Sequence, residues 1–157
     1  MYEKNERVGI SMKKEEDVLC LEKQLCFPLY ACAKEVVRKY RKPLGELNLT
    51  YTQYVVMIAL WQYGSMTEGE LGKKVCLDSG TLAPLLKRIE KEGLIKRSRQ
   101  ETDERKLLIN LTDKGVALKE KAKAVPAQMK CCLKLDDEEK KQLKYLLDKA
   151  LRGIDEE

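Results

Sequence analysis

The stretch from Leu77 to Thr112 constrains the fold more than any other part of the chain. In its first half, apolar residues recur three, four and seven positions apart, which is typical of one buried helix face. Gly93 then marks the expected helix end. Two strand-like runs, 94–97 and 106–109, follow around a charged turn. The apolar positions are Leu82, Leu85, Leu86, Ile89 and Leu94, and the opposite face carries Lys87, Arg88 and Lys91.

This helix and hairpin carry a local positive charge. Six basic and two acidic residues stand between Lys87 and Arg99, an excess of four positive charges. A cationic helix followed by a cationic hairpin suits the phosphate backbone of a nucleic acid. A solvated helix face beside an ordinary hairpin has the same composition. From charge alone, both interpretations stay open.

The composition predicts a mainly helical body. A chain of 157 residues forms one core-bearing domain, with room for a dimerisation layer. Phe and Trp together number only two and charged residues reach 36%, so the core must consist mainly of Leu, Ile and Val. A net charge of +5 makes any nucleic-acid surface local rather than chain-wide. The longest apolar run, Tyr54 to Trp61, is too short to cross a bilayer, and residues 1–17 lack a signal-like apolar segment. We therefore expect a cytoplasmic protein without membrane contact.

The absence of histidine excludes several chemistries. Ser-His-Asp and Cys-His catalysis and every His-containing metal site require a residue that this chain lacks. The six cysteines include no C-x2-C or C-x4-C pair, which argues against a four-cysteine zinc site. We expect no metal, no cofactor and no enzymatic activity. Without a secretory signal, the cysteines indicate free thiols in a reducing compartment.

The first half of the chain predicts two helices before the basic one. A helical pattern from Val18 to Tyr40 is interrupted at Pro28, so either the main helix begins near Leu25 or a short helix ends there and another begins. Both options place Cys26 near a helix N-terminus. Pro43 and Gly45 are expected to end this segment.

The next helices form a helix-turn-helix pattern. Thr50 or Thr52 caps a helix that stops at Gly64, and Thr67 opens a short helix. A turn leads from there into the basic helix. With the hairpin that follows, the unit is a winged helix-turn-helix. Ser79 or Thr81 is expected to cap the basic helix, and Pro84 fits without losing a backbone bond only under a Thr81 cap.

The C-terminal part predicts two more helices. Thr112 caps one from about Asp113 to Lys130, and Asp136 with Glu139 gives a capping-box signal for the last. An apolar stripe on the last helix favours pairing with a second subunit over burial within the chain. We therefore assign residues 15–48 and 113–157 to dimerisation and residues 49–112 to DNA binding.

Candidate DNA contacts follow from this assignment. The helix N-terminus with Ser79 and Thr81 suits phosphates, and Lys87 and Arg88 suit phosphates or guanine edges. Wing cations suit a minor groove, whereas Asp103 is as well explained as a brace for the hairpin. The full set is Ser79, Thr81, Pro84, Lys87, Arg88, Arg99, Asp103, Arg105 and Lys106.

The cysteines differ in expected reactivity. Cys20, Cys32 and Cys76 are expected to be inert, as most free cysteines are. A helix N-terminus stabilises a thiolate, so Cys26 is the candidate for oxidation by a peroxide, although its position alone does not decide this. Cys131 and Cys132 lie between two predicted helices, a plausible position for a resolving thiol.

Several motifs together resemble the MarR family, and within it the organic-hydroperoxide-sensing OhrR subgroup. They are LCFPLYACAKEVVRKYRKPL, LTYTQYVVMIALW, ELGKKVCLDSGTLAPLLKRIEKEGLIKR and ETDERKLLINLTDKG, and the match runs from about Leu21 to Pro126. The resemblance implies a homodimeric repressor of a pseudo-palindromic double-stranded operator. It implies that Cys26 is the redox-sensing cysteine and that the tyrosines supporting its thiolate are Tyr30, Tyr40 and Tyr51. The D-x-R wing motif matches Asp103 and Arg105, while Pro28 departs from the family's usual small or aliphatic residue.

The resemblance also implies how oxidation by an organic hydroperoxide would end. One branch of the family uses a low-molecular-weight thiol, and the other a C-terminal cysteine of the second subunit, here Cys131 or Cys132. Two other interpretations remain open. In one, a small aromatic ligand gates a MarR-type repressor and Cys26 is merely buried. In the other, Cys26 and Cys131 serve a thiol peroxidase.

Overall fold

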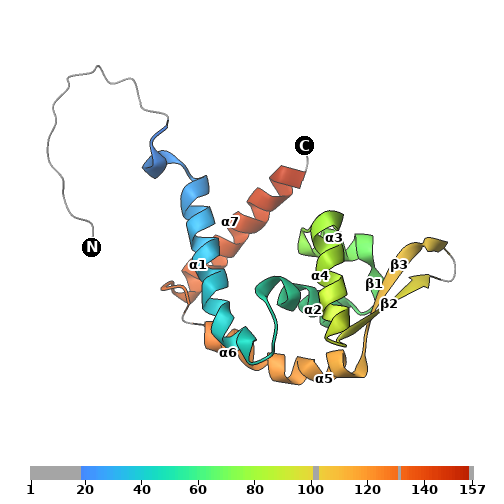
Figure 1. Cartoon of the computed structure of the whole chain (residues 1–157). Helices are drawn as coiled ribbons and strands as arrows, with labels where there is room; N and C mark the ends of the chain where they lie inside the picture. The colour runs from blue at the N-terminus through green and yellow to red at the C-terminus, as the bar shows by residue number, and fades with distance from the viewer. Residues whose placement is uncertain (1–18, 101–102, 131, 156–157) are drawn as a thin grey trace, which may run out of the picture. The chain divides into compact units, whose positions relative to one another are not determined.

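The computed structural model describes residues 19–100, 103–130 and 132–155. Helices dominate, and one small antiparallel sheet accompanies them (Figure 1), which confirms the predicted fold class. Contacts divide the chain into two compact units, with the boundary between Glu35 and Val36. In chain order the elements are η1 (Leu21–Lys23), α1 (Cys26–Gly45), α2 (Tyr51–Tyr63), β1 (Met66–Thr67), α3 (Glu68–Val75), α4 (Ser79–Lys91), β2 (Ile95–Gln100), β3 (Asp103–Leu111), α5 (Asp113–Ala122), α6 (Ala124–Met129) and α7 (Asp137–Asp155).

The first long helix begins just before Pro28, at a position where proline is tolerated. A separate 3₁₀ turn, η1, precedes α1, and α1 begins at Cys26, close to the predicted start near Leu25. Pro28 is the third residue of α1, where its missing N–H removes no helical bond. The helix ends at Gly45, as expected, although Pro43 does not itself stop it. Pro43 lies inside the last turn and is buried beside Leu44, and this packing offsets the bond that proline cannot make.

The core of the second unit is aliphatic, as the composition predicted. Val56, Met57 and Leu60 of α2 are almost fully buried, and Tyr54 is the largest aromatic side chain among the buried residues. Leu82, Leu86, Leu94, Ile95, Ile109, Ala122 and Val125 join them in the same cluster. The apolar face of α4, the root of the sheet, α5 and α6 thus share one core. Within the described chain, no helix has the length and apolar character needed to cross a membrane.

The caps predicted for α2 and α3 are present. Thr50 accepts a hydrogen bond from the main-chain N–H of Gln53, and the Gln53 side chain accepts the N–H of Thr50 in return. Thr67 forms the same capping box with Glu70. Gly64 ends α2 with φ of +77°, a conformation that glycine adopts without strain.

The sheet has one strand more than the predicted hairpin. β2 and β3 pair antiparallel, with Arg97 opposite Ile109, and β1 adds to the other side of β3 through Met66 opposite Ile109. A strand of two residues carries no readable alternation, so no sequence pattern indicated β1. Its consequence is that β3 is the central strand and β2 is an edge strand.

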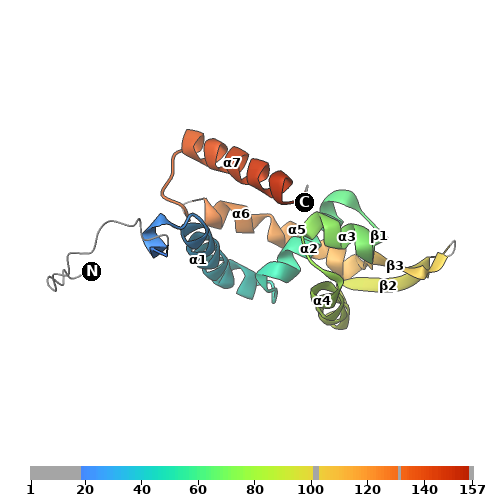
Figure 2. The same cartoon turned by 90° about the horizontal axis from the view of Figure 1, so that it is seen from above.

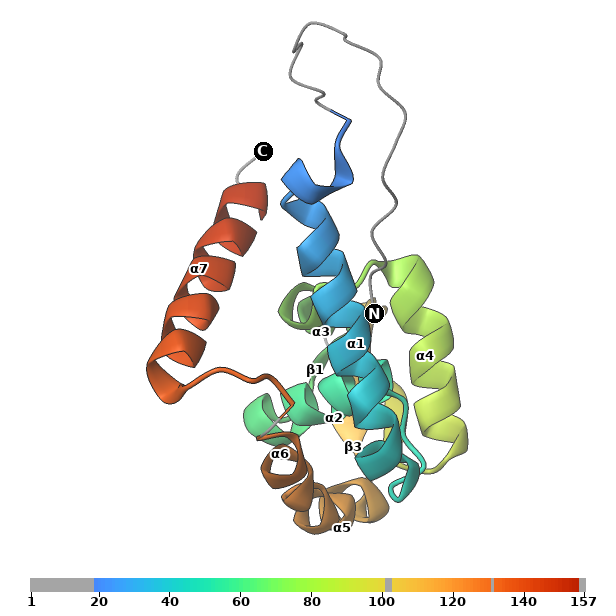
Figure 3. The same ribbon diagram turned by 90° about the vertical axis from the view of Figure 1, so that its left-hand side faces the viewer.

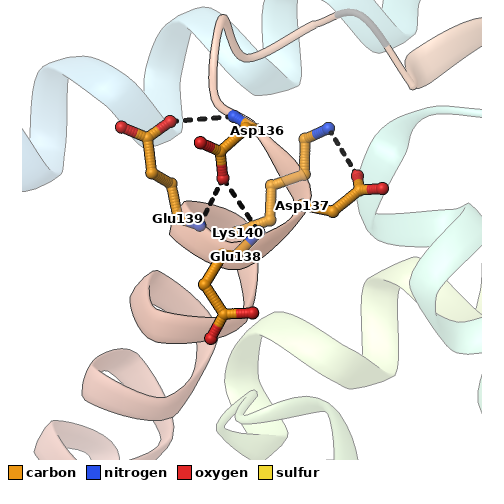
Figure 4. Close-up of polar contacts among 5 residues, drawn as sticks. All are labelled: Asp136, Asp137, Glu138, Glu139 and Lys140. Carbon is orange, nitrogen blue, oxygen red and sulfur yellow. Dashed lines mark hydrogen bonds and ion pairs between the residues drawn. The ribbon is translucent and has the colours of Figure 1, made fainter.

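The C-terminal segment differs from the single helix expected between Asp113 and Lys130. α5 ends at Ala122 and α6 begins at Ala124 (Figure 1). Pro126 explains the break, because it has no N–H to donate to the carbonyl of residue 122. The predicted capping box of α7 is present (Figure 4): the N–H of Asp136 donates to Glu139, and Asp136 Oδ1 accepts the N–H groups of Glu138 and Glu139. α7 then runs uninterrupted to Asp155 (Figure 3).

Candidate nucleic-acid interface and thiol sites

The basic helix α4 begins at Ser79 and is capped by Asp78. Asp78 accepts the main-chain N–H of Thr81 at 2.9 Å and its hydroxyl at 2.7 Å. These two bonds, the side-chain bond above all, lower the pKa of the Asp78 carboxyl below its ordinary value. We had expected Ser79 or Thr81 to be the cap, and this prediction was wrong. The D-x-x-T spacing was readable, because aspartate is a favoured N-cap and bonds three residues ahead.

Pro84 therefore occupies the sixth position of α4, inside the helix. It leaves the carbonyl of Gly80 without its usual helical donor. The favourable position under a Thr81 cap is not the one observed.

The solvent face of α4 carries the predicted contact residues. Ser79, Thr81, Pro84, Lys87 and Arg88 are all exposed, while Leu82, Leu86 and Ile89 on the opposite face are at most 1% exposed. The structure therefore brings these predicted residues together on one accessible surface. α3 packs against both α2 and α4, which gives the helix-turn-helix its rigid base.

The hairpin forms a wing beside this helix. β2 and β3 run side by side and extend outward from the helices α2, α3, α4 and α5 (Figure 2). Ser98 lies opposite Leu108 and Arg99 opposite Leu107. Arg99 is exposed near the distal end of β2. Asp103, Arg105 and Lys106 belong to the backbone of β3, but their side chains fall outside the described part of the chain. Their roles stay predictions.

An ion pair that sequence reasoning missed joins α4 to the wing. Glu90 Oε1 accepts the main-chain N–H of Arg97 at 2.9 Å, and Oε2 accepts its Nε at 2.8 Å and its Nη2 at 2.7 Å. Both side chains are partly buried, and the bonds from Arg97 lower the pKa of Glu90 below its ordinary value. An acidic residue on an otherwise basic helix was the only signal.

Cys26 is the first residue of α1 and is exposed. Tyr30 follows one turn later on the same helix face and is 63% exposed, and the Lys34 Nζ lies 5.8 Å from the centre of its ring. The predicted position of Cys26 at a helix N-terminus is confirmed. Its reactivity remains a prediction.

Two of the three predicted tyrosines meet in the second unit. The rings of Tyr40 and Tyr51 lie 4.9 Å apart, and Tyr54, which is not among the predicted tyrosines, lies 6.0 Å from Tyr40. Burial, followed by the neighbouring Tyr51 and Tyr54 hydroxyls and Cys132, raises the pKa of Tyr40. Cys132 is thus near Tyr40, in a groove that Val36, Met129 and Leu133 also line. Cys131 lies outside the described residues.

Over the described part of the chain, no group of three or more cysteine, aspartate or glutamate side chains is arranged to hold a metal ion.

A helix-turn-helix with an exposed basic second helix and an antiparallel wing defines a winged-helix DNA-binding regulator. The family model described as "Transcriptional regulator SarA/Rot" matches residues 35–122. The chain belongs to this SarA/Rot-type branch of the MarR family of transcriptional regulators and is of the OhrR type. Its relatives are regulators and not enzymes.

Relatives support this placement along nearly the whole chain. The organic hydroperoxide resistance transcriptional regulator of Bacillus subtilis (strain 168) is 44% identical over 143 residues, which cover 91% of this chain and 97% of that protein. Reduced AbfR bound to DNA is 35% identical, with a TM-score of 0.74 over 87% of this chain and 93% of that one. Disulfide-formed AbfR is 36% identical, with a TM-score of 0.63 over 85% and 91% of the two chains. AbfR is a protein of Staphylococcus epidermidis.

Proposed function

We propose that this regulator is a homodimeric repressor that senses organic hydroperoxides through Cys26 and then releases its operator. The observation that carries the proposal is the exposure of Cys26 at the first position of α1. Two comparisons support it. A relative that matches almost end to end is named for organic hydroperoxide resistance, and AbfR has been solved both reduced on DNA and as a disulfide.

The proposed chemistry begins with Cys26 as a thiolate, the form of cysteine that reacts with peroxides. The thiolate attacks the terminal oxygen of the hydroperoxide, the O–O bond breaks, and the alkoxide leaves as an alcohol after taking up a proton. Cys26 becomes a sulfenic acid. Phenol groups that donate to the thiolate would favour the charged form, and Tyr30, Tyr40 and Tyr51 are proposed for this role.

A second thiol completes the switch. It attacks the Cys26 sulfur, the S–O bond breaks, water leaves and a disulfide forms. The proposed thiol is Cys131 or Cys132 of the second subunit, or a low-molecular-weight thiol. A protein disulfide needs Cα atoms within about 7 Å. Where the reduced dimer holds them farther apart, closing the bond moves helices and changes the spacing of the two DNA-binding units.

DNA recognition is assigned to α4 and the wing. In a dimer, the two α4 helices enter successive major grooves of a pseudo-palindromic duplex. Lys87 and Arg88 project from the exposed face for phosphates or base edges, and the wing cations enter the adjacent minor groove. The proposed contact set is Ser79, Thr81, Pro84, Lys87, Arg88, Arg99, Asp103, Arg105 and Lys106.

Dimerisation is assigned to residues 15–48 and 113–157, and DNA binding to residues 49–112. α7 supports this, because Leu146, Leu151 and Ile154 on its apolar stripe are each more than half exposed. A stripe of this kind is typical of a protein–protein contact. Leu44, Ala122 and Val125 belong to the same core as α2 and α4, so the proposed division concerns function and not separate cores.

The test is a binding titration with and without oxidant. A duplex is first selected from a random pool by the reduced protein, and its binding is followed by fluorescence anisotropy. One equivalent of cumene hydroperoxide should weaken binding at least about hundred-fold, which corresponds to roughly 2.7 kcal/mol. Cys26→Ser should bind the duplex as before and ignore the peroxide, while Cys32→Ser, the matched control, should respond normally.

Unchanged DNA binding by the oxidised protein would reject the proposal. Release by a small aromatic acid that persists in Cys26→Ser would instead establish ligand gating.

A further inference from the structure

We infer that Glu90 is a positioning residue for DNA binding: it fixes the wing to the recognition helix α4, so that the wing cations reach the duplex at one defined angle. This inference rests on the proposed role of the wing in DNA contact. It adds a residue that touches no DNA itself and that opposes DNA electrostatically.

The contacts of Glu90 are unusually complete for one carboxylate. Its two oxygens accept three N–H donors of Arg97: the main-chain N–H, Nε and Nη2, all within 2.9 Å. The guanidinium presents Nε and Nη2 together to Oε2, and such charge-assisted bonds are shorter and stronger than bonds between neutral groups. The additional main-chain bond ties α4 to the backbone of β2 and not only to a side chain.

The position of β2 explains why this bond matters. In the strand order β1-β3-β2, β2 lies at the edge, so the outward N–H groups of this strand have no neighbouring strand to bond. Glu90 supplies the acceptor for Arg97 at this edge. It thereby aligns the root of the wing with the last turn of α4.

The wing extends from this anchor. Arg99 lies two residues beyond Arg97 on the same strand, so both side chains leave the same face of the sheet. Arg97 is 21% exposed and bound to Glu90, whereas Arg99 is exposed and available to solvent. One arginine therefore anchors the wing and the other is presented by it.

The negative charge of Glu90 makes a positioning role distinguishable from a direct electrostatic effect on DNA. Removing an acidic residue near a DNA surface should strengthen binding slightly, because the phosphates are repelled less. Glu90→Ala should nevertheless weaken binding of the selected duplex about ten-fold, the scale of one lost interaction with a charged group. Glu92→Ala is the matched control, since it removes the same charge from the exposed residue that follows α4, and it should bind equally or more tightly.

A double-mutant cycle tests whether Glu90 acts through the wing. In a background of Arg99→Ala with Arg105→Ala, the wing has lost its proposed contacts, and Glu90→Ala should cause less than a two-fold further loss. Arg97→Lys keeps the positive charge but not the planar fork, and should reproduce the loss seen with Glu90→Ala. It also keeps the test usable where Glu90→Ala fails to fold, as judged by circular dichroism.

Two results would overturn the inference: an unchanged affinity in folded Glu90→Ala, or an equal loss in both backgrounds. Failure of the proposed wing contact is distinguishable, because Arg99→Ala with Arg105→Ala would then bind as the unaltered protein does.

Discussion

Asp78 sets the start of the recognition helix with a single side chain. It accepts both the N–H and the hydroxyl of Thr81, so it fixes where α4 begins and which residues of its first turn face solvent. We expect Asp78→Ala to lower the midpoint of thermal unfolding by a few degrees, because the first turn loses its cap. Asp78→Ser should retain most of the stability, since serine is also a favoured N-cap. Equal destabilisation by both substitutions would show that the cap is not the cause.

Glu90 should make the folding stability of the protein depend on pH in the acid range. The pKa of its carboxyl is below the ordinary value because Arg97 binds the charged form. Its contribution to folding is therefore complete above the ordinary glutamate pKa of about 4.3 and is lost as the pH falls through the lower pKa of the folded state. Thermal unfolding of the unaltered protein and of Glu90→Gln, compared from neutral to acid pH, should give midpoints that converge at low pH. A constant difference between them would contradict this.

At the scale of elements, α5 is packed tightly onto the segment that joins α4 to the wing. Thr112 donates its N–H to the carbonyl of Leu94 and its hydroxyl to that of Gly93. The indole N–H of Trp61 donates to the carbonyl of Gly115 at 2.8 Å, which ties α5 to α2 as well. The hairpin, α2 and α5 thus meet around Gly115, and a change there would reach the root of the wing.

Gly115 permits this approach because it has no side chain. A Cβ at this position would lie 2.0 Å from the carbonyl oxygen of Leu94, so Gly115→Ala should destabilise the fold by more than about 2 kcal/mol. Gly69→Ala in α3 is the matched control. A Cβ there has open space, and alanine should raise stability by up to about 1 kcal/mol. Urea unfolding of both variants measures the difference, and a tolerated Gly115→Ala would refute the close packing.

Local signals were sufficient for elements that are defined by neighbours in sequence. The helix starts at Thr67 and at Thr50, one of the two alternatives for α2, and the stop at Gly64 were predicted, because each needs only residues three or four positions away. The two-residue strand β1 was not readable, since it exists only through pairing with β3. The break near Lys123 was readable from Pro126 but was missed.

The same distinction applies to the candidate site. The exposed basic face of α4 followed from helical periodicity, and the position of Cys26 near a helix N-terminus followed from the proline pattern. The bond between Glu90 and Arg97 depends on how β2 lies against α4, which is a tertiary property. The approach of Cys132 to Tyr40 joins residues about ninety positions apart, so no local pattern contains it.

At the scale of the whole molecule, the distribution of apolar surface predicts assembly. The core of the second unit is closed around α2, with Val56, Met57 and Leu71 fully buried. On α7, by contrast, Leu146, Leu147 and Ile154 are at least 37% exposed and recur at helical spacing. The apolar face of such a helix stabilises the protein only when another surface covers it and removes it from water. A second copy of the chain is the partner that the proposed function requires.

Charge on the stripe should therefore prevent dimerisation. We expect the unaltered protein to sediment at twice the 18.1 kDa chain mass and Leu147→Glu with Leu151→Glu to sediment as a monomer, because two carboxylates would be buried without partners. Arg152→Glu is the matched control: at about 100° per residue it projects from the opposite side of α7, and it should leave the dimer intact. The monomer should also lose at least about hundred-fold in affinity for a palindromic duplex, since it grips one half-site. A dimer that survives both glutamates would place the interface elsewhere than on α7.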